Sequence, residues 1–296
     1  MKHRKQHFVP ESYLKAWCDP TMPPGHKPSV WVHPRDRSSP RRKAPSNLFY
    51  EQDFYTITAP GGFRDLRLEH GLAELESRFA SIRRTTLTSQ TTLRPDTVFV
   101  VLAFTAAMQL RTVVSQESIR ATYEPALETM REMTKWLATA TEDEKRQLEG
   151  LPRDPSEQGR GLTLDEVEEV VRNPLQTVLA ERIGIVTQLF LHLDVAILST
   201  TDPLGFVTSD NPCVWIDPEG RNRQPPFQGP ALMYETIQIT LPISPSQVLL
   251  LNRQGLKGYN RLEDRGFVDE VNRRTIAFAR EAFIAKHAES RPEWFV

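Results

Sequence analysis

The spacing of apolar residues changes once along this chain, from a helical period to short strand-like runs. Between residues 65 and 192, apolar side chains recur every three or four positions, as Leu68, Leu72 and Leu75 do. This is the period of an amphipathic helix. Beyond residue 194 the apolar runs are short, rich in Val and Ile, and separated by Pro, Gly, Asn and Asp. Helices and strands therefore occupy different stretches of the sequence, which favours an α+β fold.

The same patterns place the individual elements. A short helix begins at Pro10, and longer helices are predicted at residues 65–86, from Pro95 through Thr112, at 116–138 with a break near Pro125, at 174–192 and at 265–286. Strands are predicted at 195–199, 205–208, 213–216, 236–240 and 247–251, and their short connections indicate an antiparallel meander. An earlier strand at 29–33 is expected to pair with residues 53–58. The predicted fold is α+β, with a helical middle and an antiparallel sheet formed mainly by the C-terminal third.

The 296 residues are interpreted as a single domain with one surface insertion. Residues 139–162 are acidic and then rich in Pro and Gly, and they show no apolar period. We expect this segment to be an exposed insertion. The predicted core includes six large apolar side chains: Trp17, Leu72, Phe79, Val101, Phe104 and Ile239.

Charge and cysteine content restrict the cellular context. The chain has 37 Lys and Arg against 38 Asp and Glu, so its net charge gives no general attraction to nucleic acid or anionic membrane. Residues 1–45 are nevertheless basic, with ten Lys or Arg against three Asp or Glu. Cys18 and Cys213 form neither a disulfide framework nor a zinc motif, which is typical of a reducing compartment. With no apolar run long enough to cross a bilayer, we expect a cytoplasmic protein that does not contact membranes.

His7 lies directly before the first predicted helix. Val9, at the expected cap position, cannot accept a hydrogen bond, so the first N–H groups lack a side-chain partner. Together with Lys5, this helix start could bind an anion. In the alternative interpretation, an acidic residue from elsewhere caps the turn and His7 only orders the loop.

Charged side chains also border the most apolar helix. Arg111 follows a long apolar run, and burial of an unpaired guanidinium is very unfavourable, so it needs a carboxylate or an anionic substrate. Glu69 and Glu76 are seven positions apart and share one helix face, where they could bind a metal, pair with Arg111 or be solvated. Gln109, two positions before Arg111, is a second candidate substrate ligand.

Asp210 and Asn211 directly follow a predicted strand and precede Pro212. A turn fixed by proline can hold a carboxylate on rigid support, as a general base requires. Asp and Asn are also ordinary turn formers, so a plain β-turn is the alternative. The chain lacks a phosphate-binding loop, a dinucleotide fingerprint, a nucleophile elbow and an H-E-x-x-H motif.

Several segments together resemble domain-of-unknown-function family 4238. They are Gln6-His7-Phe8-Val9-Pro10, Gln109-Leu110-Arg111-Thr112, Phe206-Val207-Thr208-Ser209-Asp210-Asn211-Pro212, Leu241-Pro242-Ile243-Ser244-Pro245, and Asn272 in the final helix. The resemblance extends from about residue 3 to 285 and departs mildly at Trp17, where the family has phenylalanine. That family has no established activity, so the resemblance implies no catalytic role.

Three hypotheses for function follow. The first is a hydrolase acting on a phosphate-containing substrate or nucleic acid. Its residues would be His7 and Asp210 as catalytic groups, Gln109, Arg111 and Asn211 as substrate ligands, and Glu69 and Glu76 as ligands of a divalent metal. The second is a non-catalytic module that binds a small molecule or a protein. The third is a buried polar network that only stabilises the fold, in which His7, Arg111 and Asp210 would be fully paired.

Overall fold

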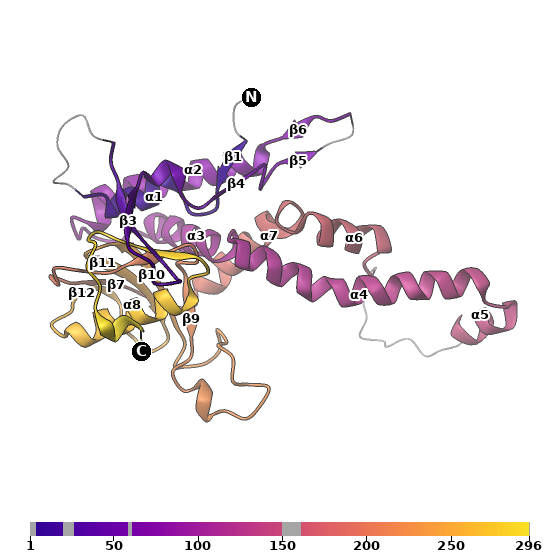
Figure 1. Ribbon diagram of the computed structural model, residues 1–296. Coiled ribbons are helices and arrows are strands. Elements are labelled where there is room, and N and C mark those ends of the chain that lie inside the picture. Colours follow the sequence, from indigo (N-terminus) through magenta and orange to yellow (C-terminus); the bar gives the residue numbers. More distant parts are fainter. Residues whose placement is uncertain (1–3, 20–26, 59–60, 150–160, 296) are drawn as a thin grey trace.

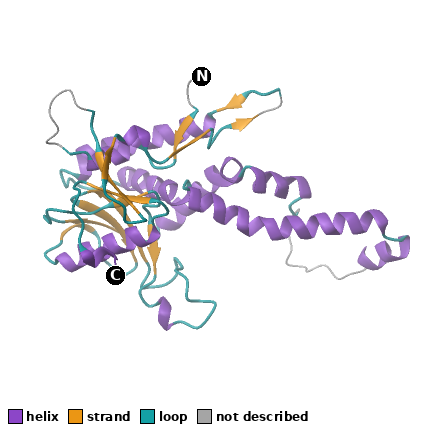
Figure 2. Cartoon of the chain, in the orientation of Figure 1, coloured by secondary structure: helices purple, strands orange, loops and turns teal. Residues whose placement is uncertain are grey.

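The computed structural model describes residues 4–19, 27–58, 61–149 and 161–295 (Figure 1). The helices are α1 (Glu11–Leu14), α2 (Arg67–Ile82), α3 (Pro95–Leu110), α4 (Val113–Thr139), α5 (Glu142–Glu149), α6 (Leu164–Arg172), α7 (Pro174–Phe190) and α8 (Arg265–Phe278). Most strands gather on one side of the molecule, and the long helix α4 extends away from them (Figure 2). The chain has the predicted α+β fold.

α3 is the central helix of the helical half. It packs against α2 and α7, and nearly every residue from Val100 to Leu110 is buried. The rings of Phe79 on α2 and Phe104 on α3 stack with centroids 3.7 Å apart and an interplanar angle of 3°. All six side chains predicted for the core are buried, which confirms that assignment: Trp17, Leu72, Phe79, Val101, Phe104 and Ile239.

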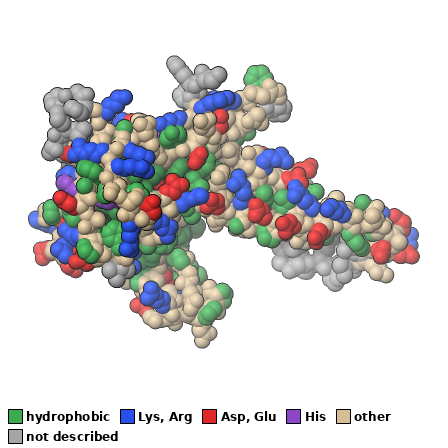
Figure 3. Space-filling view, viewed as in Figure 1, with side chains coloured by type: hydrophobic (Ala, Val, Ile, Leu, Met, Phe, Trp, Pro, Cys, Tyr) green, Lys and Arg blue, Asp and Glu red, His purple; other side chains and the backbone are tan. Residues whose placement is uncertain are grey.

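α4 projects from the body and carries α5 at its far end (Figure 1). The predicted break near Pro125 is wrong, because α4 continues through it as one helix. Pro125 lies on an exposed face, where water can satisfy the carbonyl that loses its helical N–H partner. α6 packs along α4, and Arg131 pairs with Glu168 at 2.7 Å. Acidic and basic side chains are interspersed along this projection (Figure 3).

The start of α6 agrees with the sequence pattern. Thr163 caps it, and Glu166 completes a capping box. Of the predicted insertion at 139–162, residues 141–147 are exposed or half-buried. Residues 150–160 lie outside the described residues, and the single-domain assignment stays a prediction.

The larger sheet has five strands in the order β12-β7-β11-β10-β9. They are β7 (Asp194–Ser199), β9 (Val214–Ile216), β10 (Gln238–Ser244), β11 (Gln247–Asn252) and β12 (Gly258–Arg261). β9, β10 and β11 are consecutive antiparallel neighbours, as predicted, and β7 pairs antiparallel with β11, whereas β12 adds in parallel to β7. The prediction that residues 205–208 form a strand of this meander is wrong, because only Thr208–Ser209 form a strand there (β8), and it pairs with residues 282–285 in a second sheet. Ala196 and Leu198 pack against α8, while Ile197 between them faces the helical core. The sheet is therefore covered on both faces.

A second sheet joins the two ends of the chain in the order β3-β2-β13-β8. It contains β2 (Val30–Pro34), β3 (Arg41–Lys43), β8 (Thr208–Ser209) and β13 (Ala282–Ala285). Two small ribbons complete the structure: β1 (Lys5–His7) with β4 (Tyr50–Gln52), and β5 (Ile57–Thr58) with β6 (Arg64–Asp65).

Two expectations about this second sheet are corrected. The strand at 29–33 does not pair with 53–58; β2 pairs with β3 and β13 instead. The last helix does not continue to residue 286, because α8 ends at Phe278 and residues 282–285 form β13. β13 is buried throughout, because Ala282 and Ile284 pack into the main core while Phe283 and Ala285 pack with Trp294 on the other face.

No single helix among the described residues is long and apolar enough to cross a membrane. α3 and α4 meet the length and hydropathy requirement only when taken together, across a bend of 64°.

Candidate functional site

The bend between α3 and α4 is encoded by two residues. Arg111 ends α3 with backbone angles outside the helical region, and Thr112 is extended. The Thr112 hydroxyl accepts the Ser115 N–H at 3.2 Å and so caps the start of α4. Gln109 and Arg111, two positions apart at the end of α3, lie in different surroundings: Arg111 contacts Glu76 and His7, whereas Gln109 lines a cavity.

Arg111 is buried and paired. Its guanidinium donates to Glu76 Oε1 at 2.6 Å, to the His7 carbonyl at 2.5 Å and to the Tyr55 hydroxyl at 3.2 Å. Burial alone would lower the pKa of Arg111, but Tyr55 and Glu76 raise it above its ordinary value, so the side chain stays charged. Glu76 is one of the two carboxylates that the sequence suggested as partners of Arg111.

Glu69 lies on the same face of α2 as Glu76. Burial raises the pKa of Glu69, and the nearby positive charge of Arg111 opposes this shift without reversing it. Among the described residues, no group of three or more His, Cys, Asp or Glu side chains could hold a metal ion. Metal binding by Glu69 and Glu76 stays a prediction.

His7 is half-buried at the end of β1, and its ring lies 5.7 Å from that of Tyr50. Burial lowers its pKa, against a hydrogen bond to the Ser46 backbone that raises it. The buried Nε2 has no hydrogen-bond partner among the described residues. The following helix, α1, has only four residues, and its cap position is Pro10 rather than Val9, with no side-chain cap. Anion binding at this helix start stays a prediction.

Asp210 holds the turn between α8 and β13. Its carboxylate accepts the backbone N–H groups of Arg280 at 2.8 Å, Glu281 at 2.6 Å and Ala282 at 3.4 Å. Burial raises the pKa of Asp210, against these three N–H groups, which lower it. The carboxylate thus receives the hydrogen bonds of a structural cap.

His7, Arg111 and Asp210 do not share one set of contacts. Arg111 reaches His7 through the His7 carbonyl, whereas the Asp210 carboxylate binds a different turn. Of the three, Asp210 alone lines a small cleft of about 140 Å³, which we call the Asp210 cleft and whose other lining residues include Phe8, Phe49, Val114 and Arg280.

Gln109 and Asn211 line a larger cavity of about 310 Å³, here called the Gln109 cavity. Its polar lining residues are Gln109, Thr112, Ser115, Ser118, Arg182 and Asn211, and its apolar wall includes Cys213, Trp215 and Phe278. Val114, in the first turn of α4, borders both this cavity and the Asp210 cleft. The segments that carry the 109–112 and 206–212 motifs therefore meet here.

Several polar groups of the Gln109 cavity lack partners. The buried Gln109 Oε1 has none among the described residues, and Arg182 forms no ion pair with any of them. The Trp215 indole nitrogen has no oxygen acceptor among the residues that the structure describes. The neighbouring Cys213 sulfur is a weak acceptor. Asn211, in contrast, donates to the Phe278 carbonyl at 3.1 Å.

The chemistry of the Gln109 cavity suits binding. It combines hydroxyl groups, an amide and an exposed guanidinium with one aromatic wall, which is the composition of many small-molecule sites. Burial raises the pKa of Cys213 to about 12, so this residue is a neutral thiol and not an activated nucleophile. Sequence reasoning missed Ser115, Ser118, Arg182 and Trp215. Only the hydroxyl residues spaced three positions apart after Arg111, namely Thr112, Ser115 and Ser118, signalled any of them.

Comparison with known proteins gives one family. Residues 5–290 match the family described as "Protein of unknown function (DUF4238)". No curated protein and no solved structure matches the chain. Because the match extends over nearly the whole chain, this protein belongs to that family of unknown function.

Proposed function

We propose that this protein is a small-molecule-binding protein whose ligand occupies the Gln109 cavity. The observation that supports the proposal is the pairing state of its side chains. Gln109 Oε1 is buried without a partner among the described residues, and a buried unpaired acceptor is unfavourable unless a ligand or water donates to it.

The ligand class is a small organic phosphate. Arg182 supplies a guanidinium without a carboxylate partner in the described chain, and Ser115 and Ser118 add hydroxyl groups on the first turns of α4. Phosphate favours such a combination of charge and donors near a helix start. Trp215 and Phe278 provide apolar surface for the body of the ligand.

The hydrolase hypothesis has less support. A general base needs a lone pair within reach of the reacting proton, but Asp210 is buried and three of its roughly four lone-pair sites already accept backbone N–H groups. A phosphate clamp needs free donors, whereas Arg111 donates to Glu76, Tyr55 and a backbone carbonyl.

The cytoplasmic location remains part of the proposal, supported by the free thiols of Cys18 and Cys213.

Thermal unfolding with a panel of small phosphates tests this function. Ribose 5-phosphate, glycerol phosphate and adenosine monophosphate are each compared with the unphosphorylated compound. At a hundredfold excess over Kd, a bound ligand stabilises by about 2.7 kcal/mol, which raises the Tm by about 5 °C for a chain of this size. The Arg182→Gln variant should lose this shift, whereas Arg84→Gln, which removes an exposed arginine elsewhere, should keep it.

Two results would contradict the proposal. One is equal stabilisation by phosphorylated and unphosphorylated compounds, and the other is full phosphate binding by Arg182→Gln. Release of inorganic phosphate from any member of the panel would instead support the hydrolase hypothesis.

A further inference from the structure

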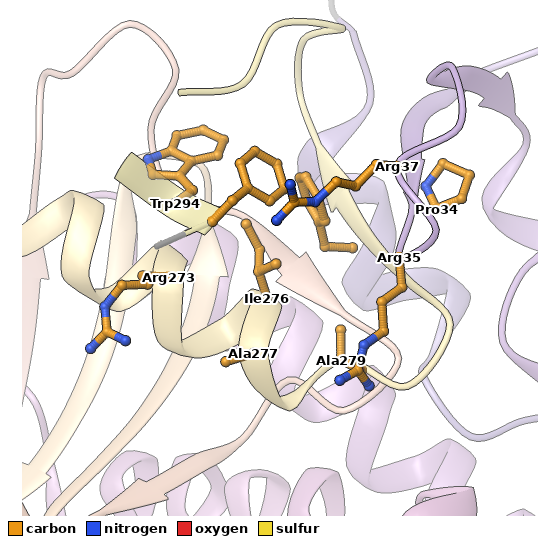
Figure 4. Close-up of a pocket in the computed structure, with 10 residues that line it drawn as sticks. Pro34, Arg35, Arg37, Arg273, Ile276, Ala277, Ala279 and Trp294 are labelled. Carbon is orange, nitrogen blue, oxygen red and sulfur yellow. The ribbon is translucent and has the colours of Figure 1, made fainter. Parts of the chain in front are cut away.

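A second cavity lies between the β2–β3 turn and the C-terminal elements (Figure 4). Its volume is about 210 Å³. The floor and walls are apolar and come from α8, β13 and the terminal 3₁₀ turn Pro292–Phe295: Ile276, Ala277, Ala279, Phe283, Trp294 and Phe295. Three arginines also line it: Arg35, Arg37 and Arg273.

Two of these arginines already have partners. Arg273 forms two hydrogen bonds to Glu270, at 2.7 and 2.8 Å. Arg35 donates from Nη1 to the Ala279 carbonyl at 2.7 Å and forms no ion pair with a described residue. The pocket thus keeps a positive charge that its own side chains do not neutralise.

Arg37 is the third arginine, and it lacks a carboxylate partner among the residues that the structure describes. The nearest carboxylate in sequence, Asp36, accepts the Ser38 N–H at 2.9 Å instead. The Arg37 guanidinium lies 5.3 Å from the Phe295 ring centroid and extends from the turn toward the terminal turn (Figure 4). Its exposed position leaves its donors accessible to a ligand.

The backbone at Arg37 is also unusual. Its φ is +61°, in the left-handed region that glycine adopts readily and that disfavours residues with a Cβ. The Arg37 N–H closes a turn to the Pro34 carbonyl at 3.1 Å. Glycine would form this turn with less strain, so the arginine side chain must contribute something other than turn stability.

The apolar walls are fixed in place. Trp294 is buried and donates to Asp269 at 2.7 Å, and Arg291 pairs with Asp202 and Asp269, both at 2.7 Å. The Phe283 ring stacks on His33 at 4.5 Å. These contacts hold the aromatic surfaces without a ligand, so the cavity is preformed.

We propose that this cavity is a second binding site, specific for a small organic carboxylate with an aromatic or branched apolar body. The carboxylate accepts hydrogen bonds from Arg37, and the body contacts Phe283, Phe295 and Ile276. The cavity is smaller than the usual range of drug-sized pockets, and a ring of benzene size fits such a volume. This site is independent of the Gln109 cavity and does not rest on the function proposed for it.

Isothermal titration calorimetry with benzoate tests the proposal. Benzyl alcohol provides a similar body without the charge, and inorganic phosphate provides charge without the body. We expect benzoate to bind at least tenfold more tightly than either. Arg37→Gly should fold with an unchanged or slightly higher Tm and should bind benzoate at least tenfold more weakly.

Three further variants separate the alternatives. Arg41→Gln removes an exposed arginine from the same hairpin outside the cavity and should bind benzoate like the parent. Ala277→Trp fills the exposed mouth while keeping every charge and should abolish binding. Arg182→Gln should leave benzoate binding unchanged, so that failure here and failure of the phosphate site can be distinguished.

The proposal is overturned if benzoate binds no better than benzyl alcohol, or if Arg37→Gly binds it like the parent. It is also overturned if Arg37→Gly lowers the Tm and the parent binds no benzoate, since Arg37 would then serve only to hold Phe295.

Discussion

At the scale of single residues, His7 combines two structural roles. Its carbonyl accepts a hydrogen bond from buried Arg111, while its half-buried ring lies against Tyr50. The charged form of the ring is unfavourable there because burial lowers its pKa. His33 shows the same direction of shift from burial, although the His287 carbonyl opposes it. Both imidazoles therefore favour the neutral state in the folded protein.

The sign of the pH dependence follows from these lowered pKa values. Below the unfolded pKa of about 6.5, the unfolded chain binds more protons than the folded one, so stability decreases as pH falls. The decrease levels off below the folded pKa. We expect the Tm of His7→Gln, measured by thermal unfolding, to decrease less than the Tm of the parent when the pH is lowered from 7.5 to 5. The raised pKa values of Asp210 and Glu69 change stability with pH in the opposite direction to the imidazoles, but both proteins contain these carboxyl groups, so their effect cancels in the comparison. An equal decrease of Tm in both proteins would contradict the assignment.

At the scale of elements, α2 is held against α3 by apolar packing and by an ion pair. Phe79 stacks on Phe104, and one turn away Glu76 pairs with Arg111 at the end of α3. The sequence predicted the helices and their inward faces, because the apolar period is a local property. It also indicated a carboxylate for Arg111, since a guanidinium beside such an apolar helix requires a partner. It could not choose between Glu69 and Glu76, because both share one face and the choice depends on where along α2 the end of α3 packs.

We expect Glu76→Gln to destabilise the protein by about 2 kcal/mol, because Arg111 would keep its charge in a buried site without a carboxylate. Glu74→Gln is the matched control on the same helix. Glu74 is highly exposed and lies 3.9 Å from Arg78, so its substitution should have no measurable effect. Urea unfolding of the three proteins at pH 7 measures the difference. Equal stability of Glu76→Gln and the parent would show that the pair contributes nothing.

At the scale of the whole molecule, distant segments determine what local patterns could not predict. β13 follows α8 closely and is as apolar as a helix core, and pairing with β2, about 250 positions earlier, and with β8 makes it a strand. The Gln109 cavity likewise combines α3, α4, α7 and β9, whose relative placement depends on the 64° bend. Gln109 and Asn211 were predicted as substrate ligands, together with Arg111, and they lie in motif segments. Arg182 and Trp215 had no such signal.

Asp210 links three of these distant segments, and its substitution distinguishes a structural role from a catalytic one. It follows β8, and its carboxylate accepts the N–H groups between α8 and β13, so one side chain connects the second sheet to α8. Asp210→Ala leaves these N–H groups without an acceptor, and we expect a loss of about 3 kcal/mol in urea unfolding. Glu281→Ala removes an exposed neighbouring carboxylate but keeps the backbone donors, so it should unfold like the parent. An unchanged stability of Asp210→Ala would contradict the structural role and return Asp210 to the candidates for a general base.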